Sequence, residues 1–375
     1  MIDLGSQKQF NQAYKGLEAV LQEMRLATPR TSAKNIPLAD LDLSRFEVVN
    51  GIKYHRAVIT LRSVGCEWTK TNGGCTMCGH WAGASIEQTP NGDVLYNQFR
   101  SMFDKVDWNK YPVVCLYNGG SIINPAEIPQ EVFWQIMDCI AKTDAIKTVV
   151  LESRAEYINR DHLTRLRNVL GTRHIRIAMG LESADAGVRR LLVHKGSSLE
   201  RFKRACELIN EMASLRLYGL IKPPWLTEKE AIDDAVATIK LGEELGAEDI
   251  HFEPVTVQNH TLVKILWEKG LFKLPSLWSV IEILKQVAPS QVYVSPFAHV
   301  PRPIAIPQTC PKCDEQVKQA ILQDYNKSHN VSVFDKLDCE CKADWLKELE
   351  VMDERPLSER VMADLDCLRN VVKAR

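Results

Sequence analysis

The chain has 375 residues, a formal net charge of −1 and 45% hydrophobic residues, which are values typical of a soluble globular protein. It contains no apolar run of roughly 18 to 20 residues, and its first residues lack the basic start and apolar core of a signal peptide. These features exclude a membrane-spanning chain and a uniformly basic nucleic-acid binder, and they predict a cytoplasmic protein.

The predicted elements begin with one amphipathic helix. Residues 8–26 carry apolar side chains at helical spacing, which predicts a helix packed on the main body. From residue 57 onward, short apolar runs alternate with helical segments. The runs are 57–63, 113–120, 148–153, 175–183, 215–224 and 250–257, and the helical segments between them include 127–142, 161–170, 199–212 and 229–245.

This alternation predicts an α/β fold with a parallel sheet. Nearly continuous apolar strands separated by helices are typical of parallel sheets whose faces are covered. Six βα units would form a barrel-like or open sheet, and the residues after each strand would gather at one edge. We predict three parts: a helical extension over 1–56, the sheet over 57–294, and a cysteine-rich C-terminal region over 295–375 that begins with a proline-rich linker.

Three of the eleven cysteines follow the first predicted strand, in the stretch VGCEWTKTNGGCTMCGH. Eight residues separate Cys66 from Cys75 and two separate Cys75 from Cys78, on a glycine-rich loop that can fold closely around a bulky group. Three thiolates suit a four-iron cluster, because one iron then stays open for a small chelating ligand. The alternatives are structural zinc, with His80 as a fourth ligand, and unliganded cysteines.

This loop resembles the cluster-binding loop of radical S-adenosylmethionine (SAM) enzymes. The common spacing in that superfamily is three residues and then two, and the longer first spacing is similar to that of the tRNA-modifying Elongator-type branch. The resemblance implies a partial (βα)6 TIM-type barrel and a [4Fe-4S] cluster on Cys66, Cys75 and Cys78. It also implies that SAM binds the open iron and that an external electron donor supplies the electron for a 5′-deoxyadenosyl radical.

Residues at other strand ends agree with the resemblance. Glycines let backbone carbonyls approach SAM, a carboxylate can accept from its ribose hydroxyls or ammonium, and an arginine can pair with its carboxylate. The cofactor-binding candidates at the ends of the second, third and fourth strands are Asn118, Gly119, Gly120, Ser121, Glu152, Arg154, Glu182 and Ser183. The alternative is that they form ordinary turns and helix caps.

Further motifs narrow the resemblance to one family. ESRAEYI, GLESADAGVRRLLVHKG, LIKPPWLTE and EPVTVQNHTLVKILWEKG, in this order, are similar to the radical SAM lyases of archaeosine biosynthesis. That family matures a 7-deazaguanine base in the D-loop of tRNA, after a transglycosylase-like partner protein has attached lysine to the base. The resemblance therefore implies cleavage of a C–N bond in the lysine-derived part, with tRNA as the substrate.

Two residues are the candidates for the catalytic step. Lys222 lies at the end of the fifth predicted strand and Glu253 in the sixth, with Gln258 and His260 just beyond. A lysine-like tail requires a clamp, and the ammonium of Lys222 is a suitable partner for its carboxylate. The alternative for Lys222 is a side chain that extends from a strand end toward water.

One sector of the chain is basic. Residues 160–204 hold eleven Lys or Arg and four Asp or Glu, a local net charge of +7 in a chain of −1. Such a sector can follow RNA phosphates, or it can be a set of solvated helix faces. The near-neutral total favours a protein that borrows RNA affinity from a partner, or one with a small substrate.

Four more cysteines lie near the C-terminus. Cys310 and Cys313 form the sequence CPKC, and Cys339 and Cys341 form CEC. Two close pairs can complete a tetrahedral four-sulfur site, which predicts structural zinc. An auxiliary iron–sulfur cluster is the alternative.

The sequence thus favours a radical SAM lyase that modifies tRNA. A first alternative is a radical SAM enzyme of the same branch that acts on a small molecule or peptide. A second, from another class, is a noncatalytic RNA-binding protein stabilised by metal.

Overall fold

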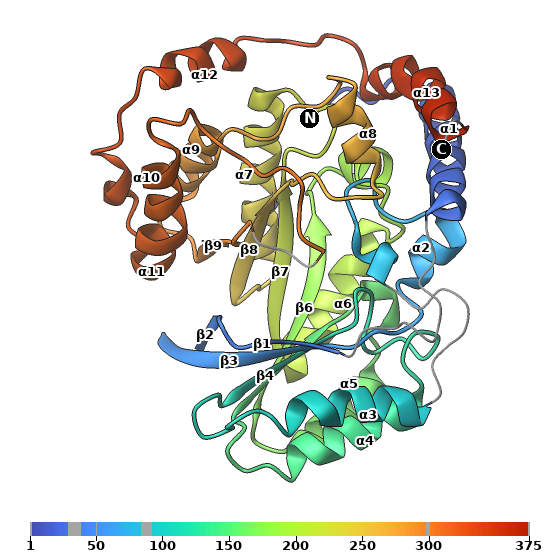
Figure 1. The fold of residues 1–375 in the computed structure, drawn as a ribbon, viewed down its shortest axis with the longest axis vertical. Coiled ribbons are helices and arrows are strands. Elements are labelled where there is room, and N and C mark those ends of the chain that lie inside the picture. Colours follow the sequence, from blue (N-terminus) through green and yellow to red (C-terminus); the bar gives the residue numbers. More distant parts are fainter. Residues whose placement is uncertain (1, 29–38, 50, 84–91, 298–300, 374–375) are drawn as a thin grey trace.

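A computed structural model gives the fold and describes residues 2–28, 39–49, 51–83, 92–297 and 301–373. In these residues one sheet is formed by β1 (Asp40–Asp42), β2 (Phe46–Val49), β3 (Ile52–Thr60), β4 (Val113–Tyr117), β5 (Thr148–Glu152), β6 (His174–Glu182), β7 (Ser214–Ile221), β8 (Asp249–Pro254) and β9 (Val292–Val294). Strands β3 to β9 are parallel neighbours in chain order, and β1 and β2 pair antiparallel with β3. The predicted partial barrel is confirmed, because β3 to β8 are the six predicted strands (Figure 1).

The helices alternate with the strands as predicted. They are α1 (Gln7–Ala27), α2 (Glu67–Asn72), α3 (Gly92–Phe103), α4 (Gln130–Ala141), α5 (Arg160–Leu170), α6 (Leu199–Met212), α7 (Glu228–Glu244), α8 (Leu262–Glu268), α9 (Leu277–Val287), α10 (Asp314–Gln319), α11 (Asn326–Ser328), α12 (Cys341–Leu349) and α13 (Leu357–Lys373). Side-chain caps fix several starts, such as Thr227 before α7, which forms a capping box with Glu230. None of the described helices is both long and apolar enough to cross a bilayer.

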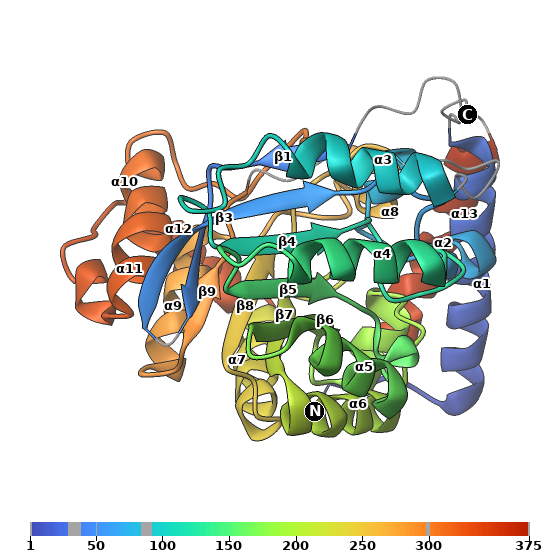
Figure 2. The same cartoon turned by 90° about the horizontal axis from the view of Figure 1, so that it is seen from below.

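The outer face of the sheet is apolar and carries the helices. Leu116, Leu151 and Ile177 share this face in the strand register and are completely buried. They pack in one core with side chains of α3 to α6, which lie along this face in Figure 2. Burial of this core gives the sheet its main hydrophobic stabilisation.

The inner face of the sheet is polar at the amino-terminal end of the half-barrel. Strand register places Arg56, Arg176 and Arg216 on this face. All three contact the fully buried carboxylate of Glu47 in β2, and Arg216 also pairs with Asp249 at 2.6 Å. Burial alone would raise the pKa of Glu47, but the three guanidinium groups lower it to about 2. An ion-pair network therefore closes the amino-terminal end of the half-barrel.

The opposite end, which we call the mouth, is formed by the carboxyl ends of β3 to β8. The arrows of β3, β4 and β5 in Figure 2 point to the side where α1, α2 and α13 lie. Helices α1 and α13 contact each other, and Gln9 donates a hydrogen bond to Glu359 at 2.9 Å. The first and last helices of the chain therefore stand together beside the mouth.

The region after residue 260 contains more regular secondary structure than the sequence pattern predicted. Helices α8 and α9 follow, and the short strand β9 adds a seventh parallel strand that was not predicted. The first predicted strand is β3, which begins at Ile52 and not at residue 57. The predicted helical extension 1–56 also contains β1 and β2, because these short strands pair with β3 at the edge of the sheet. Residues 298–300 of the predicted linker 295–308 lie outside the described residues, but Ala305 forms a β-bridge with Val257 at the mouth. The described end of this segment is thus fixed to the sheet domain.

Candidate functional site at the cysteine loop

The loop after β3 holds the three predicted cluster ligands. Cys66 is the N-cap residue of α2, and Gly73 ends that helix with a left-handed φ of 85°. Cys75 and Cys78 follow, and all three residues are of intermediate exposure and free of disulfides. The short helix and the left-handed turn at Gly73, which suits glycine, reverse the chain so that it can surround one bound group.

Neighbouring elements brace this loop through its backbone. Thr76 donates through its N–H to the carbonyl of Val193 at 3.1 Å and through its hydroxyl to that of Leu192 at 2.7 Å. The N–H of Gly79 donates to Oε1 of Gln258 at 2.8 Å. The loop is therefore tied to the segment after β6 and to the segment after β8, so its shape is set before any ligand binds.

The thiols differ in how readily they ionise. Burial raises the pKa of Cys75 to about 12. Burial also opposes ionisation of Cys78, but the charge and hydrogen bond of His80, whose Nδ1 lies 3.4 Å from the sulfur, lower its pKa to about 7. Thiolates are the ligand form of cysteine, so at least Cys78 is prepared for metal binding near neutral pH.

The glycine-rich segment after β4 reaches the cysteine loop. Gly119 has a left-handed φ of 70°, and a Cβ there would lie 3.4 Å from that of His80. A Cβ on Gly120 would lie 3.0 Å from Cα of Cys66 and would clash with Glu127. The absence of side chains thus lets this backbone approach the cluster ligands closely.

A buried carboxylate, Glu127, ties these two segments together. It accepts hydrogen bonds from the backbone N–H groups of Ser121 at 2.7 Å and Glu67 at 3.0 Å. The side-chain amides of Asn118 and Asn124 donate to it at 3.0 and 3.1 Å. Because Glu67 directly follows Cys66, Glu127 fixes the predicted SAM-binding segment relative to a cluster ligand.

The candidates at the end of β5, Glu152 and Arg154, lie beside the cysteine loop. Nη1 of Arg154 is 3.7 Å from Sγ of Cys66, and its guanidinium also pairs with Glu156. Glu152 points into the mouth, where burial raises its pKa to about 7 despite the opposing influences of His80 and Tyr218. The structure therefore brings Glu152 and Arg154 to the cysteine loop, as the sequence predicted.

The two cofactor-binding candidates at the end of β6 have different surroundings. Glu182 adopts a left-handed φ of 67° and accepts from Nζ of Lys195 at 2.5 Å, in a pair whose charges both act on Cys75. Ser183 is completely buried, and its hydroxyl donates to Asp234 of α7 at 2.5 Å. The side chain of Glu182 is thus at the mouth, whereas that of Ser183 is engaged with the surrounding helix layer.

The two catalytic candidates also differ. Lys222 is 6% exposed, has a left-handed φ of 61°, and donates to the carboxylate of Glu228 at 2.5 Å. That carboxylate also accepts from Ser276 and Ser279, so the ammonium of Lys222 is already paired. Glu253 lies in the mouth, where burial raises its pKa to about 7. The predicted clamp role of Lys222 requires its ion pair with Glu228 to open.

The basic sector is not one continuous surface. Arg176 and Arg189 are 1–2% exposed, and Arg189 donates to the carbonyl of Leu181 at 2.7 Å. Arg167 donates to the carbonyls of Met212 and Arg173. The exposed cations of the sector are Arg160, Arg165, Arg190, Arg201, Lys203 and Arg204. Several of the charges counted in the sequence therefore stabilise the fold and cannot contact RNA.

The four C-terminal cysteines meet in space. Sulfur–sulfur distances are 3.8 Å for Cys310–Cys313, 3.5 Å for Cys310–Cys339 and 3.6 Å for Cys313–Cys341. All four sulfurs lie within 4.8 Å of one another, in a core shared with α9. Four thiolates at about 2.3 Å from one tetrahedral ion would lie about 3.8 Å apart, so the group can bind a single metal ion.

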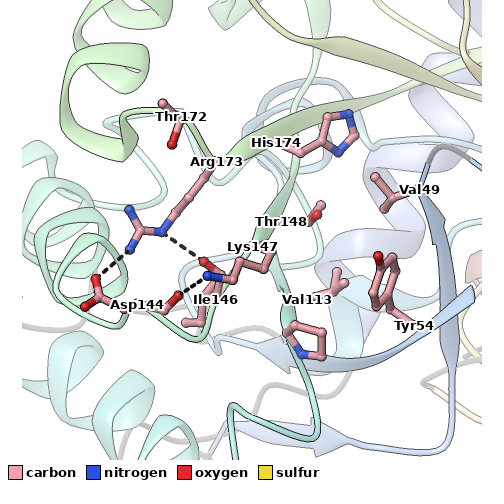
Figure 3. Close-up of a pocket in the computed structure, with 11 residues that line it drawn as sticks. Val49, Tyr54, Val113, Asp144, Ile146, Lys147, Thr148, Thr172, Arg173 and His174 are labelled. Atoms are coloured by element: carbon pink, nitrogen blue, oxygen red, sulfur yellow. Dashed lines mark hydrogen bonds and ion pairs between the residues drawn. The ribbon is translucent and has the colours of Figure 1, made fainter. Parts of the chain in front are cut away.

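A cavity at the far end of the sheet is separate from this site. Figure 3 shows its lining, which includes Val113, Thr148 and His174, the first residues of β4, β5 and β6. Arg173 crosses it and donates to the carbonyl of Ile146 at 3.1 Å. None of the predicted site residues lines it.

Sequence reasoning missed residues that act by long-range contacts. Glu127 holds the cysteine loop and the predicted SAM-binding segment, and Arg25 of α1 donates to the carbonyls of Gly73 and Cys78. Neither lies in a motif, and each meets the loop from a part of the chain that is distant in sequence. Gln258 was named from its motif, but its contact with the backbone N–H of Gly79 in the cysteine loop was not predicted. Only the spacing of Glu127 from the glycine-rich segment offered a local signal.

Comparison with known proteins gives the following relatives. The archaeosine synthase subunit beta of Methanosarcina acetivorans is 28% identical over 344 residues, which cover 90% of this chain and 96% of the relative. An uncharacterized protein of Methanocaldococcus jannaschii is 31% identical over 365 residues, or 91% and 94% of the two chains. Among solved structures, Methanocaldococcus infernus Elp3 has a TM-score of 0.44 at 16% identity, over 60% of this chain and 57% of that chain. No model of a protein family matches the chain.

The predicted cofactors fit the residues of the mouth. Among the described residues, Cys310, Cys313, Cys339 and Cys341 are the group placed to hold a single metal ion, and Cys66, Cys75 and Cys78 are not part of it. Three thiolates on one loop suit a cluster in which each thiolate binds a different iron. The glycine-rich backbone and Arg154 adjoin Cys66, where SAM would reach the open iron.

Proposed function

We propose that this chain, which belongs to the radical SAM family that includes the beta subunits of archaeosine synthase, is a lyase that modifies tRNA. Its reaction would cleave a C–N bond in the lysine-derived part of a modified 7-deazaguanine and leave the amidine group on the base. The observation that carries the proposal is the meeting of Cys66, Cys75 and Cys78 with the glycine-rich segment and Arg154 at one mouth.

The residues of the mouth support distinct roles in this reaction. When bound, the cluster and SAM supply a 5′-deoxyadenosyl radical, which can remove a hydrogen atom next to the nitrogen to be cut. Cys66, Cys75 and Cys78 would hold the cluster. The position of Arg154 supports pairing with the carboxylate of SAM, and Glu127 holds the glycine-rich backbone where SAM would bind.

Two carboxyl groups suit the substrate part of the mouth. Burial raises the pKa of both Glu152 and Glu253 to about 7. Such groups can hold or release a proton near neutral pH, and a cationic neighbour favours their ionised form. We propose that Glu253 meets a cationic nitrogen of the lysine-derived substrate, and that Glu152 meets SAM.

We also propose that Cys310, Cys313, Cys339 and Cys341 bind one structural zinc ion. Three of their sulfur separations are 3.5 to 3.8 Å and all four sulfurs lie within 4.8 Å of one another, which supports a single tetrahedral ion over an auxiliary cluster, whose thiolates bind separate irons. The indole Nε1–H of Trp278 in α9 donates to Sγ of Cys341 at 3.4 Å and would orient this thiolate toward the ion. The ion would fasten the C-terminal region to the sheet domain.

A partner subunit would supply much of the tRNA affinity. The Methanosarcina acetivorans relative is named as a beta subunit, which supports an assembly with a second chain. The dispersed cations of residues 160–204 and the net charge of −1 agree with this arrangement. The transglycosylase-like protein that attaches lysine to the base is the partner we propose.

An anaerobic turnover assay tests the function. Full-length chain reconstituted with iron and sulfide is mixed with SAM, a reductant and tRNA that carries the lysine-modified base, with and without the partner. We expect 5′-deoxyadenosine and an amidine-bearing nucleoside by mass spectrometry, and neither product from unmodified tRNA. Reconstituted protein that cleaves no SAM under any of these conditions would overturn the proposal.

The same assay separates the small-molecule alternative. The lysine-modified nucleoside is supplied free of RNA in a parallel reaction. Conversion of the free nucleoside at the rate of the tRNA would favour an enzyme of the same branch with a small substrate. Conversion of the tRNA alone supports the lyase that we propose.

A further inference from the structure

Helix α1 brings one buried charge to the mouth. Its apolar face, which includes Leu17 and Leu21, packs in the core shared with α13. Arg25, in the last turn, is the one charged residue among the buried positions of this helix, and it is 6% exposed. A buried cation is costly unless hydrogen bonds and an opposite charge compensate it.

The guanidinium of Arg25 donates hydrogen bonds to four backbone carbonyls. Nε donates to Gly73 at 2.8 Å, and Nη2 donates to Cys75 at 3.3 Å and Cys78 at 3.2 Å. Nη1 donates to the carbonyl of His260, after β8, at 2.7 Å. The planar guanidinium thus holds three points of the cysteine loop and joins them to a second segment of the mouth.

Among the described residues, the guanidinium of Arg25 forms no ion pair with a carboxylate, and its hydrogen bonds go to backbone carbonyls. The negative groups that act on it electrostatically are the sulfurs of Cys78, Cys75 and Cys66. Three thiolates carry more negative charge than the core of a [4Fe-4S] cluster carries positive charge, so the loaded loop offers the missing counter-charge.

The contact between α1 and the loop is also close in the backbone. A Cβ on Gly73 would lie 2.7 Å from Cβ of Leu21 and 2.8 Å from the backbone N of Gln22. Because Gly73 has a φ of 85°, another residue there would be strained as well as crowded. The loop is therefore seated directly on α1, at the turn that carries Arg25.

We propose that Arg25 is a positioning residue of the cofactor site, which orders the cysteine loop and offsets the negative charge of the loaded cluster. The N-terminal helix is then a part of this site and not an appendage. The inference rests on the cluster proposed above. It predicts that loss of the guanidinium makes addition of an electron less favourable, because reduction makes the cluster more negative.

The test compares three variants of the full-length chain, each reconstituted anaerobically with ferrous iron and sulfide. Arg25→Gln removes the charge, and Arg25→Lys keeps the charge but loses the planar guanidinium group with its several N–H donors. Lys15→Gln, on an exposed position of the same helix, makes the same charge change away from the loop. Iron per chain, the midpoint potential of the cluster and thermal unfolding of the iron-free chains are measured.

We expect Arg25→Gln to lower the midpoint potential, so that the ratio of reduced to oxidised cluster at a fixed potential falls about tenfold, or about 59 mV for one electron. Arg25→Lys should retain less iron than wild type, but its midpoint potential should stay close to that of wild type. Lys15→Gln should match wild type in both measurements.

Three outcomes would overturn either the role of Arg25 or the proposed function. Wild-type iron content and potential in Arg25→Gln would overturn the inference. If Arg25→Gln does not fold, Arg25→Lys decides, because a midpoint potential lowered by about 59 mV in a variant that keeps its charge would overturn the charge role. A wild-type chain that binds no four-iron cluster would instead refute the proposed function, so the two failures are distinguishable.

Discussion

Cys310, Cys313, Cys339 and Cys341 bring their sulfurs within 4.8 Å of one another, whereas Cys66, Cys75 and Cys78 form no such group in the described chain. The C-terminal sulfurs lie in an apolar core beside α9, with an indole N–H as a neighbour. The mouth sulfurs are surrounded by Arg25, Arg154 and His80, and their loop is held by hydrogen bonds to its backbone.

The difference shows how surroundings assign roles to the same side chain. A closed set of four thiolates leaves a metal ion no open position, which suits a structural site. Three thiolates beside charged groups, at the carboxyl ends of parallel strands, leave a position for a ligand that reacts. Changes to the two sets should therefore have different consequences.

The largest effect should follow from the mouth cysteines. Replacing Cys66, Cys75 or Cys78 by Ala should abolish SAM cleavage and remove the visible absorption of the cluster, because the open iron exists only while three thiolates hold the others. Anaerobic SAM-cleavage assays and absorption spectra measure this. The matched control is Cys139→Ala in α4, which should behave as wild type, and activity retained in any mouth variant would contradict the cluster assignment.

The C-terminal set should affect stability instead. Cys313→Ala should lose about one zinc per chain, and its unfolding free energy should fall by roughly 4 kcal/mol or more, as expected when a structural metal is lost. The spectrum of the mouth cluster should not change. Metal analysis and denaturant unfolding measure both effects, and loss of about four irons without loss of zinc would show that this set binds a cluster.

The network around Glu47 sharpens the comparison, because it stabilises the fold without metal. Glu47→Gln should cost about 3–5 kcal/mol, since three buried guanidinium groups lose an anionic partner. The folded-state pKa of about 2 is below the ordinary 4.5, so this stabilisation is complete above pH 4.5 and is lost as pH falls toward 2. The free energy of unfolding, measured across this pH range, should depend less on pH in the variant than in wild type.

Two observations would contradict this account of Glu47. The first is a variant whose stability equals that of wild type at neutral pH. The second is an unchanged pH dependence between 4.5 and 2. Glu211→Gln is the control, because its pair with Arg160 is exposed and contributes little.

A smaller effect is expected at the SAM-binding segment. Glu127→Gln turns one acceptor oxygen into a donor that faces the N–H groups of Ser121 or Glu67. An unsatisfied buried donor costs about 1–3 kcal/mol, so SAM affinity should fall roughly tenfold to a hundredfold at constant iron content. Calorimetric titration with SAM measures this, with the exposed Glu131→Gln as control, and equal affinities would refute the role of Glu127.

The elements of the fold were predictable because they follow local periodicity. Helix α1 and strands β4 to β8 lie within a few residues of the predicted segments. The short β9 was missed because three residues give no periodic signal. The basic sector was harder to interpret, because an arginine in a sequence does not reveal whether it faces solvent or, as Arg176 does, a carboxylate 129 residues away.

The same limit applies to the site. Motifs placed Glu152 and Arg154 correctly beside the cysteine loop, since strand ends meet at one edge. They could not indicate that Ser183 turns to Asp234, or that Lys222 is paired with Glu228. These pairings, like that of Arg25 with the loop, depend on how helices pack around the sheet and not on local sequence.

Electron paramagnetic resonance of the reduced protein, with and without SAM, tests the central claim most directly. We predict a cluster signal that SAM changes in wild type and in Cys313→Ala, and no such signal in Cys75→Ala. A signal that persists unchanged in Cys75→Ala, or that disappears in Cys313→Ala while the chain stays folded, would contradict a SAM-binding cluster on the mouth cysteines.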